Sequence, residues 1–129
     1  MATTAPLPSA AISGADWDTA HQEVLAVLRA LIRIPSVNPV PADAPDGEMR
    51  AARYLAERLS TLGLTPEIVE PVPGRGSVHV RLRGDGTGGD PFLLLSHLDV
   101  VPAPPERWTH DPFAADIAAQ RLEFRSVNL

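Results

Sequence analysis

The chain has 129 residues, of which 44% are hydrophobic and 21% are charged, a balance that indicates a folded domain rather than wholesale disorder. The net charge of −5 comes without a basic stripe, which argues against nucleic acid or an anionic membrane as a partner, and no apolar run approaches the ~20 residues of a membrane span. Because the sequence has no cysteine, it excludes disulfides and thiolate metal sites, so any metal must be held by histidine and carboxylates.

The N-terminal part is expected to hold a leader and a helix. Residues 1–15 are rich in Ala, Thr, Pro and Ser and contain no basic residue, so we expect a mobile leader rather than a secretory signal. Apolar residues recur at helical spacing through residues 17–34, which predicts a helix. Asp16 or Asp18 is the expected N-cap, and Pro35 should end the helix because it disfavours helical backbone in the residue before it.

A second helix and a hairpin are expected next. Residues 47–63 place apolar residues on one face, with Asp46 as the expected N-cap and Gly63 at the C′ position. Residues 65–72 and 77–83 are predicted to be strands joined by a turn, because apolar and polar residues alternate along the second of them.

A continuous apolar run from Phe92 to Leu95 predicts a third strand at residues 91–97 that is buried on both faces. Such a strand usually lies inside a sheet covered by helices, so the predicted fold class is α/β. Two helices and three strands are few elements to cover it, and we therefore infer that the chain is part of a larger domain. The alternative is a small three-stranded sandwich in which Leu94 is half covered.

A glycine pattern between the second and third strands has the spacing of a dinucleotide-binding loop. Gly84, Gly86 and Gly89 satisfy G-x-G-x-x-G, but such a loop must open a helix whose N-terminus faces the pyrophosphate. Asp90 and Pro91 follow here, and then a predicted strand. The pattern therefore indicates a hairpin loop.

His97 and Asp99 follow the apolar run, at the strand end where ligands gather in open α/β sheets. If the backbone stays extended, the two side chains project to the same side. Neutral imidazole is a good zinc ligand, and a carboxylate that accepts from its other nitrogen fixes the tautomer and raises its basicity. The pair is therefore a candidate half-site for a metal. The alternative is a histidine that is merely hydrogen-bonded at a strand end.

Four segments occur in an order that resembles a known family: "LIRIPSVNP" at 31–39, "EMRAARYLAERLSTLGL" at 48–64, "LLLSHLDVVP" at 93–102 and "RWTHDPFAADI" at 107–117. Together they are similar to the opening of the zinc peptidase family of aminoacylase, acetylornithine deacetylase, succinyl-diaminopimelate desuccinylase and glutamate carboxypeptidase. The resemblance covers about residues 17 to 122, and the third segment is the most specific.

The resemblance implies roles for individual residues. His97 corresponds to a zinc ligand of a two-metal site, and Asp99 corresponds to the catalytic-site carboxylate that supports this ligand. The segment from Trp108 to Phe113 resembles a loop that we interpret as structural. Residues 123–129 depart from the family pattern, because they supply neither its Gly-Arg-Gly segment nor the Asp that bridges the two metals, and the later ligands have no counterpart here.

From the resemblance we expect residues 16–122 to be the N-terminal part of a three-layer α/β catalytic domain with a mixed sheet. The implied activity is zinc-dependent hydrolysis of an amide bond in N-acyl amino acids or short peptides. One histidine cannot hold a catalytic zinc, so we expect this chain to be inactive alone. The alternative is a small non-catalytic α/β binding module. We expect a cytoplasmic location, with which the lack of cysteine is compatible.

Overall fold

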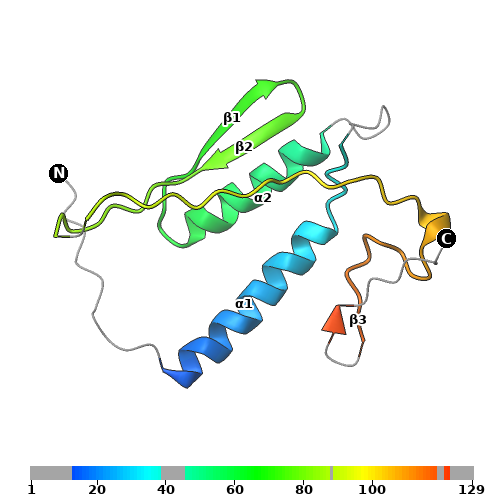
Figure 1. The fold of residues 1–129 in the computed structure, drawn as a ribbon, viewed down its shortest axis with the longest axis horizontal. Helices are drawn as coiled ribbons and strands as arrows, with labels where there is room; N and C mark the ends of the chain where they lie inside the picture. The colour runs from blue at the N-terminus through cyan, green and yellow to red at the C-terminus, as the bar shows by residue number, and fades with distance from the viewer. Residues whose placement is uncertain (1–12, 39–45, 88, 119–120, 123–129) are drawn as a thin grey trace.

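A computed structural model describes residues 13–38, 46–87, 89–118 and 121–122. The predicted tail at 123–129 and most of the predicted leader at 1–15 lie outside these residues. The elements in chain order are α1 (Gly14–Ile32), α2 (Gly47–Thr61), β1 (Glu67–Val72), β2 (Arg75–His79), the 3-10 helix η1 (Pro105–Arg107), β3 (Ile117–Ala118) and β4 (Arg121–Leu122). Helices and strands therefore mix along the chain, and the predicted α/β class is confirmed (Figure 1).

The N-terminus of α1 is closed by a capping box. The Ser13 hydroxyl accepts from the backbone N–H of Asp16 at 3.2 Å, and the Asp16 carboxylate accepts from the backbone N–H of Ser13 at 2.8 Å. The prediction that Asp16 or Asp18 is the N-cap is wrong, because the helix begins three residues earlier than its apolar pattern does. Hydrogen bonds from Ser13 lower the pKa of Asp16 below its ordinary value.

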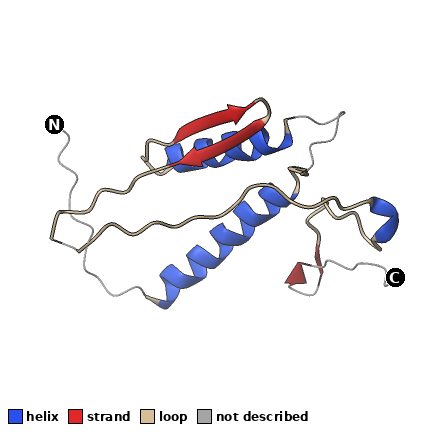
Figure 2. Ribbon diagram, turned by 45° about the horizontal axis from the view of Figure 1, so that its top comes forward, coloured by secondary structure: helices blue, strands red, loops and turns tan. Residues whose placement is uncertain are grey.

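The buried core lies where α2 packs against the β1–β2 hairpin. Met49, Ala51 and Ala52 are buried on α2, and a Cβ at Gly76 of β2 would collide with the Met49 sulfur. Figure 2 shows the hairpin lying along the helix. The small residues on both sides allow this close approach. The expected C′ glycine of α2, Gly63, has a φ of 77°, which glycine adopts without strain.

The predicted third strand is neither buried nor paired. Phe92, Leu93, Leu94 and Leu95 are between 79% and 89% exposed, and residues 91–99 are extended without a neighbouring strand in the described part of the chain. The predictions of burial on both faces and of a half-covered Leu94 are both wrong for this chain. The reason is the shortage of covering elements, since α2 faces the hairpin and α1 contributes no buried residue.

Pairing between strands is limited. Within the described residues, β1 pairs with β2 and β3 with β4, both antiparallel, and a single parallel bridge joins Val37 to Val100. No helix among these residues is long and apolar enough to cross a membrane.

The exposed run predicts self-association of the purified chain. An extended segment with four outward-facing apolar side chains and unpaired backbone groups is a template for pairing with a second copy. Leu94→Lys should shift the apparent mass, measured by light scattering across a concentration series, toward the monomer. Gln22→Lys adds the same charge at an exposed position of α1 and serves as the control. A wild-type chain that stays monomeric at all concentrations would contradict this expectation.

The capping box predicts a pH-dependent effect of Ser13→Ala. Because the folded-state pKa of Asp16 lies below the ordinary value of 3.8, its ionised form stabilises the helix above that pH. This contribution is lost as the pH falls through the folded-state pKa. Ser13→Ala should therefore raise the pKa of Asp16, measured from its carboxyl carbon shift, and lower the thermal midpoint more at neutral pH than in acid. Ser60→Ala removes a hydroxyl that bonds only a backbone carbonyl, and its effect should not change with pH.

Candidate functional site

The site begins with a short parallel ladder that joins the exit of α1 to the end of the apolar run. The backbone N–H of Val100 donates to the carbonyl of Ser36 at 2.9 Å, and that of Asn38 donates to the carbonyl of Val100 at 2.8 Å. The buried Ser36 hydroxyl donates to the carbonyl of Leu98 at 2.6 Å. These bonds place Asn38 beside Asp99, although 61 residues separate them in sequence.

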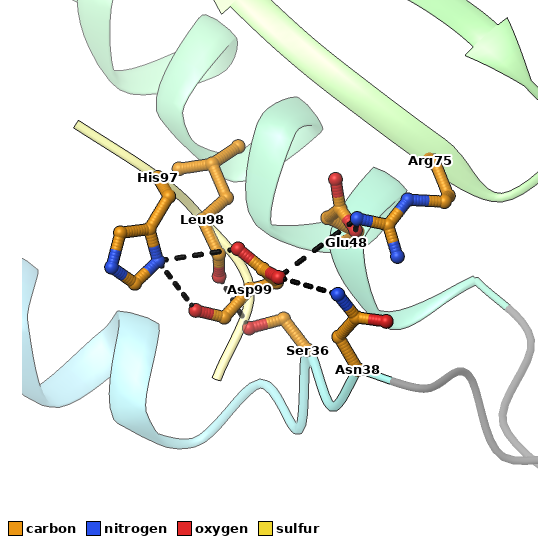
Figure 3. Close-up of polar contacts among 7 residues, drawn as sticks. All are labelled: Ser36, Asn38, Glu48, Arg75, His97, Leu98 and Asp99. Atoms are coloured by element: carbon orange, nitrogen blue, oxygen red, sulfur yellow. Dashed lines mark hydrogen bonds and ion pairs between the residues drawn. The ribbon is translucent and has the colours of Figure 1, made fainter. Parts of the chain in front are cut away.

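The structure brings the two predicted site residues together. The Nδ1 atom of His97 lies 2.8 Å from the backbone carbonyl oxygen of Asp99 and 3.2 Å from its Oδ1. Because both oxygens only accept, Nδ1 carries the proton, and Nε2 of the neutral ring has an available lone pair. Figure 3 shows the second ring nitrogen facing away from Asp99. The His97 side chain is 84% exposed, so a ligand can reach Nε2.

Two further polar residues lie against the Asp99 carboxylate, and a third holds one of them in place. Asn38 Nδ2 donates to Oδ2 at 2.8 Å, and the Arg75 guanidinium lies 3.8 Å from the same oxygen. Glu48 in turn forms an ion pair with Arg75 at 3.3 Å. The hydrogen bond from Asn38 is the main cause that lowers the pKa of Asp99, and the positive charge of Arg75 contributes less.

Sequence reasoning missed these three residues. Asn38 lies in the segment "IPSVNP", which was recognised only as part of a resemblance, and Arg75 belongs to "PGRG", which indicated no more than a turn. Glu48 lies in the first turn of α2, where an acidic residue is expected for helix stability alone. No local spacing relates them, because they come from three different elements.

The donor set fits part of a metal site. An outward Nε2 with a carboxylate behind Nδ1 is the arrangement of a metal-binding histidine. However, no group of three or more histidine, cysteine, aspartate or glutamate side chains in the described residues is placed to hold a metal. Glu48 is engaged with Arg75. The described residues therefore offer one candidate ligand with its support.

The loop after the site is tied to α1. Arg29 Nε donates to the carbonyl of Ala115 at 3.0 Å, and Arg33 Nε donates to that of Ala114 at 3.2 Å. The Asp111 carboxylate accepts from the backbone N–H of Phe113 at 2.9 Å, which closes the turn. This turn lies within the Trp108–Phe113 segment, whose structural interpretation stays a prediction.

The glycine pattern belongs to a loop, as expected, but the loop does not close a hairpin, because residues 91–99 pair with no strand in the described part of the chain. Thr87 donates to the Asp85 carboxylate through both its N–H and its hydroxyl, which lowers the pKa of Asp85. Residues 89–104 contain no helix, so this loop has no helix N-terminus at which to bind a pyrophosphate.

Fold and site together define an α/β chain with a carboxylate-supported histidine at the end of an apolar run. No protein-family model matches it. Acetylornithine deacetylase of Salmonella arizonae is 37% identical over 89 residues, which are 69% of this chain and 23% of that protein. Succinyl-diaminopimelate desuccinylase of Methylorubrum extorquens is 39% identical over 98 residues, or 73% of this chain and 23% of that protein. Acetylornithine deacetylase of Edwardsiella ictaluri is 36% identical over 98 residues, or 76% of this chain and 25% of that protein.

The chain belongs to the family that includes acetylornithine deacetylase and succinyl-diaminopimelate desuccinylase. It spans about a quarter of the length of the curated relatives that it matches. The recognition made from its motifs is thereby confirmed.

The close packing behind the ladder predicts the effect of Gly47→Ala. A Cβ at Gly47, the first residue of α2, would collide with the backbone carbonyl of Pro35 and press on Ser36. Alanine normally favours helix over glycine, but overpacking here should lower the free energy of unfolding by about 1 to 3 kcal/mol. Gly14→Ala, at the first residue of α1, meets open space and should not destabilise the chain. Urea unfolding followed by circular dichroism measures both, and equal effects would contradict the packing argument.

Proposed function

We propose that this chain contributes one ligand, His97, and its supporting carboxylate, Asp99, to the metal centre of a metal-dependent amide hydrolase. The observation that carries the proposal is the contact of His97 Nδ1 with Asp99, at 2.8 Å to the carbonyl and 3.2 Å to the carboxylate, which leaves Nε2 facing outward. The names of the relatives, a deacetylase and a desuccinylase, support removal of an acyl group from an amino acid as the reaction. N-acyl amino acids or short peptides are the proposed substrates.

Zinc, the proposed metal, would polarise the carbonyl of the scissile amide and lower the pKa of a bound water. This chain would orient the His97 ring and raise the basicity of its Nε2 atom. The Asp99 carboxylate would accept a hydrogen bond from Nδ1–H and so increase electron density at Nε2, and the backbone carbonyl of Asp99 limits rotation of the ring. The high exposure of His97 leaves its outer side open to the other parts of a metal centre.

The chain by itself is proposed to be inactive. A catalytic zinc normally takes three protein ligands and a water, whereas the described residues contain no group of three candidate ligands. We therefore propose that residues 16–122 form the N-terminal part of a catalytic domain, with the remaining ligands supplied from outside this chain. A cytoplasmic location, with which the lack of cysteine is compatible, is part of the same proposal.

A non-catalytic binding module is the second candidate. It is favoured by the exposure of Phe92 to Leu95, which a partner chain would cover. The two candidates differ in what they require of His97, because a binding module has no use for an outward-facing imidazole nitrogen.

Metal analysis of the purified chain tests the proposal. We expect well under one zinc per chain after dialysis, because a single imidazole binds zinc weakly, and no hydrolysis of N-acetylornithine or N-succinyl-diaminopimelate. Added zinc should shift the His97 ring signals in an NMR spectrum, and His97→Ala should abolish the zinc response of the surrounding residues. His79→Ala, at the end of β2, is the control and should leave that response intact. A stoichiometric zinc that survives a chelator, or a response unchanged in His97→Ala, would refute the proposal.

A further inference from the structure

We propose that Asn38 and the Arg75–Glu48 ion pair are positioning residues, which hold the Asp99 carboxylate in the orientation that supports His97. This inference rests on the proposed role of His97 as a metal ligand. According to this inference, three residues from three different elements help to determine which nitrogen of His97 faces outward.

The two oxygens of Asp99 have different partners. Oδ1 faces His97 Nδ1 at 3.2 Å, whereas Oδ2 accepts from Asn38 at 2.8 Å and lies 3.8 Å from the Arg75 guanidinium (Figure 3). The terminal torsion of an aspartate is broad, so the carboxylate rotates readily when only one oxygen is bound. Partners on Oδ2 therefore also determine where Oδ1 points.

Arg75 needs Glu48 to hold its place. Arginine is a long side chain with considerable rotamer freedom, and its guanidinium at the start of β2 has several orientations open to it. The Glu48 carboxylate, whose side chain is only 14% exposed, holds the guanidinium at 3.3 Å. From this position Arg75 reaches Asp99 by charge attraction rather than by a close hydrogen bond, which makes Asn38 the stronger of the two supports.

A purely structural role is the competing explanation, since the Arg75–Glu48 pair also links the hairpin to α2. The tautomer of His97 distinguishes the two roles. If the pair only links α2 to the hairpin, its removal leaves the His97 ring unaffected. If the pair positions Asp99, its removal changes the proportion of rings in which Nδ1 carries the proton. The backbone carbonyl of Asp99 also accepts from Nδ1, so loss of the carboxylate's orientation should weaken the tautomer preference without abolishing it.

The experiment records long-range 1H–15N spectra of the histidine side chains in the full, metal-free chain at a pH where the rings are neutral. In the wild type, the Nδ1–H tautomer of His97 should dominate. Asn38→Ala should lower the ratio of Nδ1–H to Nε2–H tautomer by about threefold, the scale of one weak hydrogen bond, and Arg75→Met by about twofold. Arg75→Lys keeps the charge and should restore most of the wild-type ratio.

Arg58→Met is the matched control. Arg58 also pairs with a glutamate, Glu23 at 3.7 Å, but this pair contacts neither His97 nor Asp99, so the ratio should not change. Backbone amide spectra of the same samples verify that α2 and the hairpin remain folded. If one variant unfolds, Glu48→Gln, which keeps the shape of the side chain, provides the same test through Arg75.

The outcomes separate the inference from the function that it rests on. An unchanged tautomer ratio in folded Asn38→Ala and Arg75→Met overturns the inference, and the function stands if zinc still shifts the His97 signals. Zinc that leaves the wild-type His97 signals unmoved overturns the ligand role itself. A reduced ratio in both variants, restored by Arg75→Lys and unaffected in Arg58→Met, supports the positioning role.

Discussion

The short parallel ladder between residues 36–38 and 98–100 is the constraint on which the site depends. It consists of two backbone hydrogen bonds and one from the buried Ser36 hydroxyl. No strand pairs with residues 91–99 in the described part of the molecule. Without the ladder, this extended segment would not be attached to the chain that follows α1. The ladder sets the position of Asp99, and through Asp99 it sets the orientation of the His97 ring.

Polar contacts, rather than apolar burial, organise this region. Asn38 reaches Asp99 from a loop and Arg75 reaches it from a strand, while Glu48 on a helix holds Arg75, and none of the three is fully buried. Contacts of this kind are individually weak in water, so their value lies in orientation more than in stability. A carboxylate with both oxygens engaged is well suited to hold an imidazole that must present one particular nitrogen.

The exposed apolar run and the supported histidine both fit the proposal that polypeptide outside this chain completes the domain. A segment such as Phe92 to Leu95 has the composition of a strand covered on both faces, yet these side chains are open to solvent here. His97, two residues beyond that run, is proposed as one of the several ligands that a catalytic metal needs. Both features fit the proposal that the remaining metal ligands and the cover of the apolar run come from outside this chain, which spans about a quarter of the length of its curated relatives.

Much of the local structure was predictable from residue patterns. Both helices, the β1–β2 hairpin, the glycine at the end of α2 and the proximity of His97 to Asp99 follow from spacing over a few residues. The N-cap of α1 was missed because Ser13 precedes the apolar pattern, and the burial of the third strand was wrong because composition shows what a segment can bury, not what covers it. Asn38, Arg75 and Glu48 carried no signal of a shared site, since each fits a loop, a turn or a helix start equally well.

The sequence by itself therefore determined the two helices, the β1–β2 hairpin, the α/β class and the proximity of His97 to Asp99, because these depend on residues close together along the chain. Only the tertiary structure decided which groups reach Asp99 Oδ2 and whether the apolar run is covered, because both depend on segments that are distant in sequence and are brought together, or left apart, by packing.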